Sequence, residues 1–274
     1  MAPANSLPLT LDHNRVGLQE YVHRIVHFRE QCDFEYTFCT MLWLCIDPRR
    51  VYRNAEYSSR TKHQWARDDP GFVVVMVALI ASSMTAWSIA LGPASISMWL
   101  ANVAYEVLVD FLGLGLVAAG VAWLVTSGRA ASTERDRDGF GDGLGEDECA
   151  APTGAQLEFA YGFDVHCNAY FPLFLATHVV QYMALPLLLR AGHLPGLLSC
   201  VLYCLALSYY TYLTFLGYNA LPFLRHTEVV VLPIGGLALL ALVGIVVGFN
   251  PTRASATFFF ATAEQLDLDE FDGG

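Results

Sequence analysis

Apolar residues collect in long blocks that contain few charges, and polar segments separate these blocks. A helix needs about 20 mostly apolar residues to cross the roughly 30 Å of hydrocarbon in a bilayer. Five blocks reach this length, at residues 71–91, 98–126, 165–189, 194–217 and 229–248. The pattern therefore predicts an all-α, polytopic membrane protein with about five transmembrane helices.

Residues with strong helix-boundary preferences flank or interrupt these blocks. Before the first block, Asp69 can accept hydrogen bonds from free backbone N–H groups, and Pro70 suits the first position of a helix. Pro172 and Pro186 lie within the third block and predict kinks there, because proline removes a backbone donor. An Asn-Pro pair at 250–251 ends the fifth block.

Composition agrees with a membrane protein once it is taken segment by segment. Hydrophobic residues make up 55% of the chain and charged residues 15%, against about 25% charged in typical soluble domains. The formal net charge of −11 comes mainly from acids at 134–148 and 264–272, so it does not describe the arginine-rich N-terminal part. The cysteines form no CxxC pair, so we predict neither a metal site nor a cofactor.

The basic residues predict the orientation of the chain. Of the 15 lysines and arginines, all but Arg190 and Arg253 precede the first block or lie in loops on the same side. Since basic residues favour the cytosolic side, the N-terminus is predicted to be cytosolic and, after five spans, the C-terminus lumenal. The predicted parts are a cytosolic segment at 1–70, a transmembrane domain at 71–250 with a flexible cytosolic loop at 127–156, and an acidic lumenal tail at 251–274.

The cytosolic segment has helical patterning of its own. Apolar residues between 16 and 28 recur near helical spacing, which predicts an amphipathic helix. The apolar stretch at 34–46 is too short to span a membrane. Two interpretations of it stay open: a helix lying in the membrane interface, or a helix packed under the bundle.

An arginine-rich patch follows this stretch and is the candidate partner-binding site. Its arginines suit anionic lipid headgroups, at about 1 kcal/mol each, or a protein partner. A tryptophan with basic neighbours is typical of an anchor at the membrane interface. The candidate set is Arg49, Arg50, Tyr52, Arg53, Trp65 and Arg67.

Ionisable residues within the apolar blocks form a second candidate site. Glu106 and Asp110 are four residues apart and so share a helix face, where each ionised acid costs about 2.5–3.5 kcal/mol at mid-membrane. They are therefore expected to face the bundle, stay protonated or pair, and the third block supplies partners that include His178 and Gln181. The candidate network is Glu106, Asp110, Asp164, His166, Asn168 and His178.

Two interpretations of this network stand, and we favour the structural one. A buried hydrogen-bonded network would fix the order of the helices, and Asp164 would cap the third helix. A proton relay, transporter or intramembrane hydrolase would instead use Glu106, Asp110, His166 and His178. The spacings GxSxG and HExxH and paired GxGD-type aspartates are absent, so no catalytic residue is predicted.

Four motifs resemble the Unc-fifty family of Golgi membrane proteins, in the same order and around similar spans. They are DPRRVYRN at 47–54, QWARDDP at 64–70, YGFDVHCNAY at 161–170 and TFLGYNALPFL at 214–224. The chain departs from the family pattern in its longer loop at 128–155, in its acidic tail and at Glu106. An acid at Asp110 fits the pattern.

The resemblance implies a five-span Golgi protein that acts in vesicular trafficking, including delivery of multi-subunit receptors to the cell surface. It also implies contact with large Arf guanine-nucleotide exchange factors, in addition to membrane lipids. We therefore expect a non-enzymatic trafficking protein. One alternative is the intramembrane enzyme or transporter described above. Another is an RNA-binding protein of the inner nuclear membrane, which is disfavoured because acids dilute the positive charge and no RNA-binding module is visible.

Overall fold

The computed structural model describes residues 33–62, 64–67, 69–92, 95–139, 157–224 and 226–260. Every regular element within these ranges is a helix, which confirms the all-α prediction. The predicted helix at 16–28, most of the predicted loop at 127–156 and the acidic residues beyond 260 lie outside the described residues.

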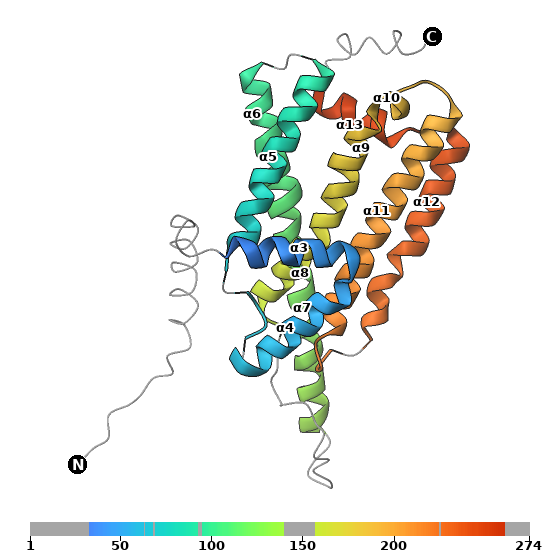
Figure 1. Ribbon diagram of the computed structural model, residues 1–274. Coiled ribbons are helices and arrows are strands. Elements are labelled where there is room, and N and C mark those ends of the chain that lie inside the picture. Colours follow the sequence, from blue (N-terminus) through green and yellow to red (C-terminus); the bar gives the residue numbers. More distant parts are fainter. Residues whose placement is uncertain are drawn as a thin grey trace, which may run out of the picture.

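Long helices run side by side and form a bundle (Figure 1). Four helical stretches are long and apolar enough to cross a membrane, and they coincide with four of the predicted blocks. They consist of α5 (Gly71–Leu91); α6 (Ile96–Tyr105) with the π-helix η1 (Glu106–Gly113) and α7 (Leu114–Gly139); α11 (His193–Asn219); and η3 (Thr227–Val231) with α12 (Pro233–Val247).

The third predicted span is a helical rod made of shorter pieces. α8 (Phe159–Phe174) continues into the π-helix η2 (Leu175–Val180) and α9 (Gln181–Met183), and α10 (Leu185–Leu188) follows. Pro172 lies inside α8 just ahead of the π-helix, and Pro186 lies at the start of α10. Each proline lacks a backbone N–H donor, which accounts for the change in hydrogen bonding nearby. With this rod included, the bundle has about five spans, as predicted.

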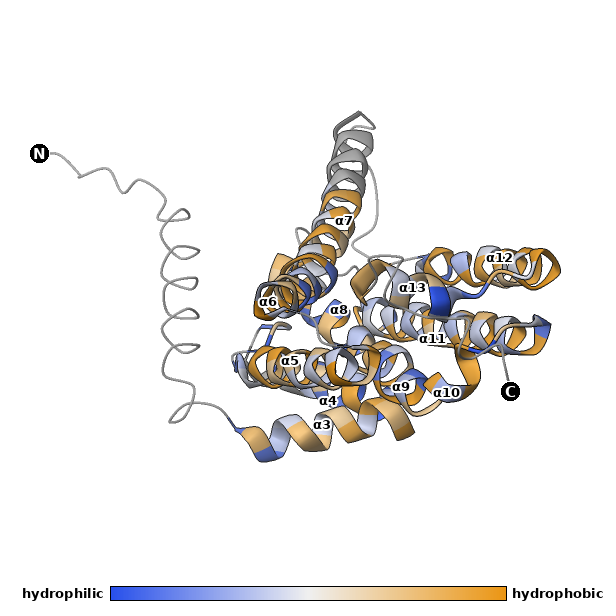
Figure 2. Cartoon of the chain, turned by 90° about the horizontal axis from the view of Figure 1, so that it is seen from above, coloured by the Kyte–Doolittle hydropathy of each residue, from blue (hydrophilic) through white to orange (hydrophobic). Residues whose placement is uncertain are grey.

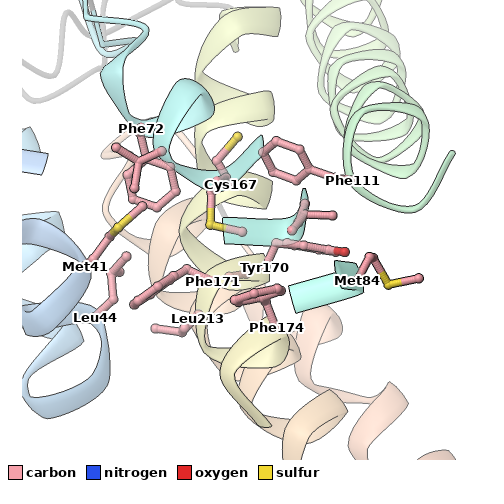
Figure 3. Packing of buried hydrophobic residues seen from close by; sticks show 14 of the residues in the cluster. Met41, Leu44, Phe72, Met84, Phe111, Cys167, Tyr170, Phe171, Phe174 and Leu213 are labelled. Atoms are coloured by element: carbon pink, nitrogen blue, oxygen red, sulfur yellow. The ribbon is translucent and has the colours of Figure 1, made fainter. Parts of the chain in front are cut away.

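α8 is the centre of the bundle. It packs against α7 on one side and α11 on the other, and most of its side chains are buried (Figure 2). Figure 3 shows Phe171 and Phe174 of α8 in the apolar core, with Phe111 of η1 and Leu213 of α11 nearby. Lipid tails are as apolar as this core, so within a bilayer it stabilises the fold through van der Waals packing.

Glycines allow the closest approaches to α8. A Cβ atom at Gly217 of α11 would lie 2.7 Å from both Val165 methyl carbons. A Cβ atom at Gly115 of α7 would lie 2.6 Å from the His166 ring. Small residues at these positions therefore set the spacing of α7, α8 and α11.

α12 is the outermost span. It packs against α11, and none of its residues is buried. Its exposed surface is apolar throughout, as the colours of Figure 2 show, and includes Leu239, Leu242 and Val246. Such a surface suits contact with lipid tails rather than water.

α3 (Phe34–Ile46) lies across the bundle near the start of α5, and α4 (Pro48–Lys62) follows it (Figure 1). One face of α3 packs on the bundle through Met41 and Leu44, whereas Phe38 and Leu42 are exposed. The packed interpretation of 34–46 thus holds for one face. The opposite apolar face suits the membrane interface, and its contact with lipid stays a prediction.

The carboxylate of Asp69 joins the starts of α3 and α5. Its Oδ1 atom accepts a hydrogen bond from the Gly71 N–H at 2.8 Å, as predicted for a cap. Its Oδ2 atom accepts from the Asp33 N–H at 3.0 Å. One side chain therefore fixes both helix starts.

Two segments are more helical than expected. α7 continues to Gly139, past the start of the predicted loop. The first part of the predicted tail is the helix α13 (Pro251–Phe260), which lies across the end of the bundle opposite α4 (Figure 1). The Asn250 side chain accepts from the Thr252 N–H at 3.0 Å and donates to the Leu188 carbonyl at 2.7 Å. These bonds start α13 and hold it against α10.

Candidate functional site

The predicted partner-binding residues divide into an outward and an inward group. Arg49, Arg50 and Arg53 are exposed on α4 and are called the arginine face below. Tyr52, on the same helix, is only 4% exposed and belongs to the core. Burial raises the pKa of its phenol, so the side chain stays neutral. Tyr52 therefore anchors α4 rather than offering a contact to a partner.

Each arginine of the arginine face makes a polar or cation–π contact within the protein. Arg49 Nε donates to the Tyr212 hydroxyl at 3.4 Å, and this bond raises the pKa of the guanidinium. The Arg50 guanidinium lies 3.9 Å above the Trp43 ring. Arg53 lies 3.8 Å from the Asp47 carboxylate. Because all three side chains stay exposed, they remain available to an anionic partner.

The inward group lies on the segment that leads into α5. Two carboxylates, one at the N-cap of α8 and one within α8, accept hydrogen bonds from three successive backbone N–H groups of this segment. Glu158 accepts from Trp65 at 3.2 Å and from Ala66 at 3.1 Å, and Asp164 accepts from Arg67 at 2.7 Å. We call Glu158 and Asp164 the acidic clamp. They bind the backbone of the segment, so these hydrogen bonds do not depend on which side chains the segment carries.

Side chains reinforce the acidic clamp. The Arg67 guanidinium donates to the Asn168 carbonyl oxygen and lies 4.6 Å above the Phe72 ring. The Trp65 ring packs edge-on against Tyr161, with ring centroids 5.8 Å apart. The structure thus brings together residues of both candidate sites. Trp65 and Arg67 belong to the predicted partner-binding site, and Asn168 belongs to the predicted intramembrane network.

Asp164 does not cap the third helix, contrary to our expectation. The N-cap of α8 is Glu158, and Asp164 lies inside the helix. Its carboxylate is used by Arg67 of another segment instead. The sequence analysis did not identify Glu158, because it adjoins the predicted loop. Its hydrogen-bond partner Trp65 also lies 93 residues earlier in the chain.

His166 is separate from the other predicted acids and bases. Its Nε2 atom lies 2.9 Å from the Phe111 carbonyl oxygen and its Nδ1 atom 2.9 Å from the Tyr210 hydroxyl. Since a carbonyl only accepts, Nε2 carries the hydrogen and Nδ1 accepts from tyrosine. Both ring nitrogens are therefore occupied in joining η1, α8 and α11.

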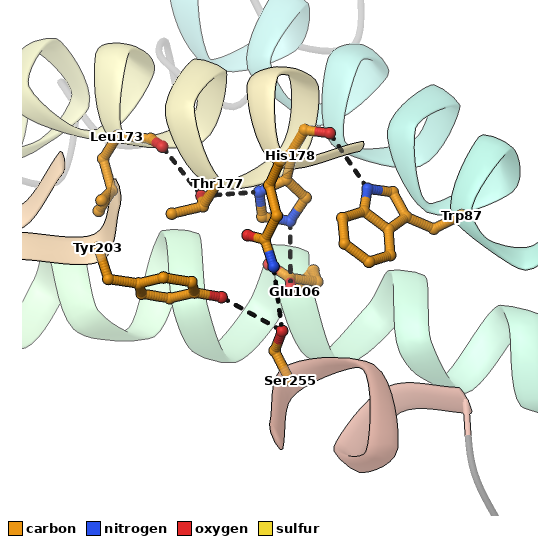
Figure 4. Close-up of polar contacts among 8 residues, drawn as sticks. Trp87, Glu106, Leu173, Thr177, His178, Tyr203 and Ser255 are labelled. Atoms are coloured by element: carbon orange, nitrogen blue, oxygen red, sulfur yellow. Dashed lines mark hydrogen bonds and ion pairs between the residues drawn. The ribbon is translucent and has the colours of Figure 1, made fainter. Parts of the chain in front are cut away.

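Three of the predicted network residues do come together. Glu106 is 3% exposed, and its Oε1 atom lies 3.3 Å from His178 Nε2 (Figure 4). His178 Nδ1 lies 3.1 Å from the Thr177 hydroxyl, and the His178 carbonyl accepts from Trp87 Nε1 at 3.1 Å. Asp110 borders the same space. These contacts link α5, η1 and η2.

The space beside these groups is a cavity of about 290 Å³, called the acidic cavity below. Gln181 Nε2 donates to the Ser255 hydroxyl at 3.3 Å, and Tyr203 donates to it at 3.2 Å. Ser255 was missed because it belongs to α13, which was expected as tail. No group of three or more His, Cys, Asp or Glu side chains within the described ranges is arranged to hold a metal ion.

Comparison with known proteins identifies the family. A sequence profile of the UNC-50 family matches residues 21–260. The chain is 40% identical to "Protein unc-50 homolog" of Dictyostelium discoideum over 89% of its own length and 87% of the relative. It is 36% identical to "Protein unc-50" of Caenorhabditis elegans (94% and 79%) and 33% identical to the Homo sapiens homolog (88% and 86%). No solved structure matches the chain. The bundle, its buried motifs and these relatives together show that the chain belongs to the UNC-50 family of membrane proteins.

Proposed function

We propose that this protein is a non-enzymatic component of the Golgi membrane that acts in vesicular trafficking. In this role its arginine face recruits a large Arf guanine-nucleotide exchange factor, and it thereby supports transport of receptors to the cell surface. Membership of the UNC-50 family supports the proposal, because the sequence motifs resemble proteins with this role.

The distribution of basic residues supports a cytosolic position for the arginine face. α4 carries Arg49, Arg50, Arg53 and Arg60 at one end of the bundle. Arg253 belongs to α13 and Arg190 closely follows α10, and these two helices lie at the opposite end of the bundle (Figure 1). Basic residues are retained on the cytosolic side during insertion. We infer that α4 faces the cytosol, where a soluble exchange factor can reach it.

The observation that carries the proposal is that α4 has one buried side and one exposed, arginine-rich side. Its inner side is anchored by the buried Tyr52, while three guanidinium groups project outward from one turn. Guanidinium groups bind carboxylates in a planar, bidentate way that specifies orientation as well as charge. An acidic segment of an exchange factor is the partner that this chemistry suits.

The test replaces Arg49, Arg50 and Arg53 together by alanine in the full-length chain. We expect exchange factor to leave Golgi membranes, while the variant itself stays at its normal level and location. Arg60→Ala is the matched control, since Arg60 lies on the same helix but pairs with Glu56 at 2.8 Å. Unchanged recruitment by the stably expressed triple variant would reject the mechanism.

A second variant separates charge from geometry. Replacing the same three arginines by lysine keeps the positive charge but loses the bidentate fork. If recruitment depends on a protein carboxylate, we expect the lysine variant to be impaired. Full recruitment by the lysine variant would point to anionic lipid as the contact instead.

A further inference from the structure

The acidic cavity contains a buried hydrogen-bond acceptor that the described residues leave unsatisfied. Gln181 is 1% exposed, and its Oε1 atom has no hydrogen-bond partner within the described part of the chain. The Asp110 carboxylate, which is half-buried, also lines the cavity. Buried acceptors are nearly always paired in folded proteins. The cavity is therefore built to receive hydrogen-bond donors.

The charges of the lining favour a cation. Glu106 and Asp110 supply two carboxyl groups, whereas His178 supplies one imidazole, which Glu106 already contacts. Among the residues that the structure describes, no lysine or arginine lines the cavity. In the low dielectric of a bilayer an unpaired carboxylate is unfavourable, so a bound positive group would complement the second acid.

The remaining wall of the cavity is apolar. Leu114 of α7, Leu173 of α8 and Leu207 of α11 line it, together with Phe259 of α13. The cavity thus lies between α7 and α11, which pack on different sides of α8. A bare ion would leave this wall without contacts, whereas an aliphatic chain would fill it.

The two π-helices of the described part of the chain, η1 and η2, border this one cavity. η1 contributes Glu106 and Asp110, and η2 contributes Thr177 and His178. π-Helical turns are rare and occur frequently at functional sites. η1 contains no proline that would account for its π-helical hydrogen bonding, so it is a second indication that a ligand occupies this space.

We propose that the acidic cavity binds a lipid-soluble primary amine, with its ammonium group among Glu106, Asp110 and Gln181 and its aliphatic chain against the leucines. An ammonium group has three donors and no acceptor, which matches these acceptor groups. The volume of about 290 Å³ suits one amine head and part of a single chain. This proposal is independent of the recruiting role of the arginine face.

The experiment uses purified full-length protein in phosphatidylcholine nanodiscs and a photoreactive, alkyne-tagged sphingosine. The matched probe carries the same chain and label with a hydroxyl in place of the amine. We expect saturable labelling by the amine probe only, mapping to peptides that contain 106–114 or 173–181. Nanodiscs that contain phosphatidylethanolamine form a further arm, and competition there would identify the amine of a membrane lipid as the source.

Variants test which groups bind the amine. We expect Asp110→Asn to weaken amine labelling about tenfold, since it removes a charge-assisted hydrogen bond. Gln181→Leu is expected to weaken labelling while leaving both carboxyl groups in place. Glu228→Gln, which removes an exposed acid on η3, is the control and should label normally.

Several results would overturn the proposal. Equal labelling by the amine and hydroxyl probes would show that the ammonium group is not recognised. Labelling that does not saturate, or that maps outside the cavity, would do the same. Because the probe comparison uses the unchanged protein, it decides the matter even if a variant fails to fold.

Discussion

The backbone N–H of Arg67 donates to the Asp164 carboxylate at 2.7 Å, a contact between residues 97 positions apart. It joins the segment that precedes α5 to the central helix α8. The side chain of Arg67 turns inward from the same point and donates to Asn168. The start of the first span is therefore attached to the third span at both backbone and side chain.

Loss of the Asp164 carboxylate is predicted to destabilise the bundle. A hydrogen bond to a charged group contributes about 1.5–3 kcal/mol, so Asp164→Ala should lower the free energy of unfolding by about that amount. Asp164→Asn keeps one acceptor oxygen and should lose less. Unfolding in mixed micelles, followed by tryptophan fluorescence, measures both. Glu228→Gln, which changes an exposed acid on η3, is the control, and an Asp164→Ala protein as stable as this control would contradict the role of the acidic clamp.

A larger residue at Gly217 is predicted to destabilise the bundle, because α8 and α11 pack closely there. Alanine there would place a methyl carbon 2.7 Å from both Val165 methyl groups, so α8 and α11 must move apart. We expect Gly217→Ala to destabilise the protein by about 1–3 kcal/mol. Val165→Ala should restore part of this loss when the two changes are combined.

The matched control for Gly217 lies on α12. Outside their own helix, no atom of the described residues lies within 4 Å of a Cβ position at Gly235 or Gly236. Alanine at Gly236 should therefore be neutral or stabilise the helix by about 0.5–1 kcal/mol. Equal effects at Gly217 and Gly236 would show that helix spacing does not depend on the glycine.

The Glu106–His178 pair is predicted to couple η1 to η2. Removing one partner of a hydrogen-bonded pair leaves the other unsatisfied, which costs about 1–3 kcal/mol. We expect Glu106→Gln and His178→Asn each to destabilise the bundle, and the double variant to lose less than the sum. A thermodynamic cycle in micelles measures the coupling. Strictly additive losses would mean that the two side chains do not depend on each other.

The exposed face of α3 is predicted to contact the bilayer at the interface. A fluorophore on Cys39, which is exposed, should be quenched by lipids brominated near the headgroup more than by lipids brominated at the chain ends. A fluorophore on an introduced cysteine at Glu56 of α4 is the control and should be quenched by neither. Equal quenching at both positions would remove the distinction between an interfacial α3 and a solvent-facing α4.

The spans could be predicted from sequence because their length and apolar character are imposed by the bilayer. Asp69 could also be predicted, since a cap acts on neighbouring residues. Glu158, Asp164 and Ser255 could not, because their partners are far away in the sequence. The predicted network residues do not form a single cluster. A helix rises about 1.5 Å per residue, so Asp164 in α8 and His178 in η2 lie about 20 Å apart along the bundle.

Labelling of sealed Golgi vesicles tests most directly whether the arginine face is cytosolic. Single cysteines are introduced at Glu56, near the arginine face, and at Arg190, near α13, after the 7 native cysteines are replaced. A membrane-impermeant maleimide should label position 56 in intact vesicles and position 190 only after detergent is added. Labelling of position 190 in intact vesicles, with position 56 protected, would contradict the orientation and with it the recruiting role.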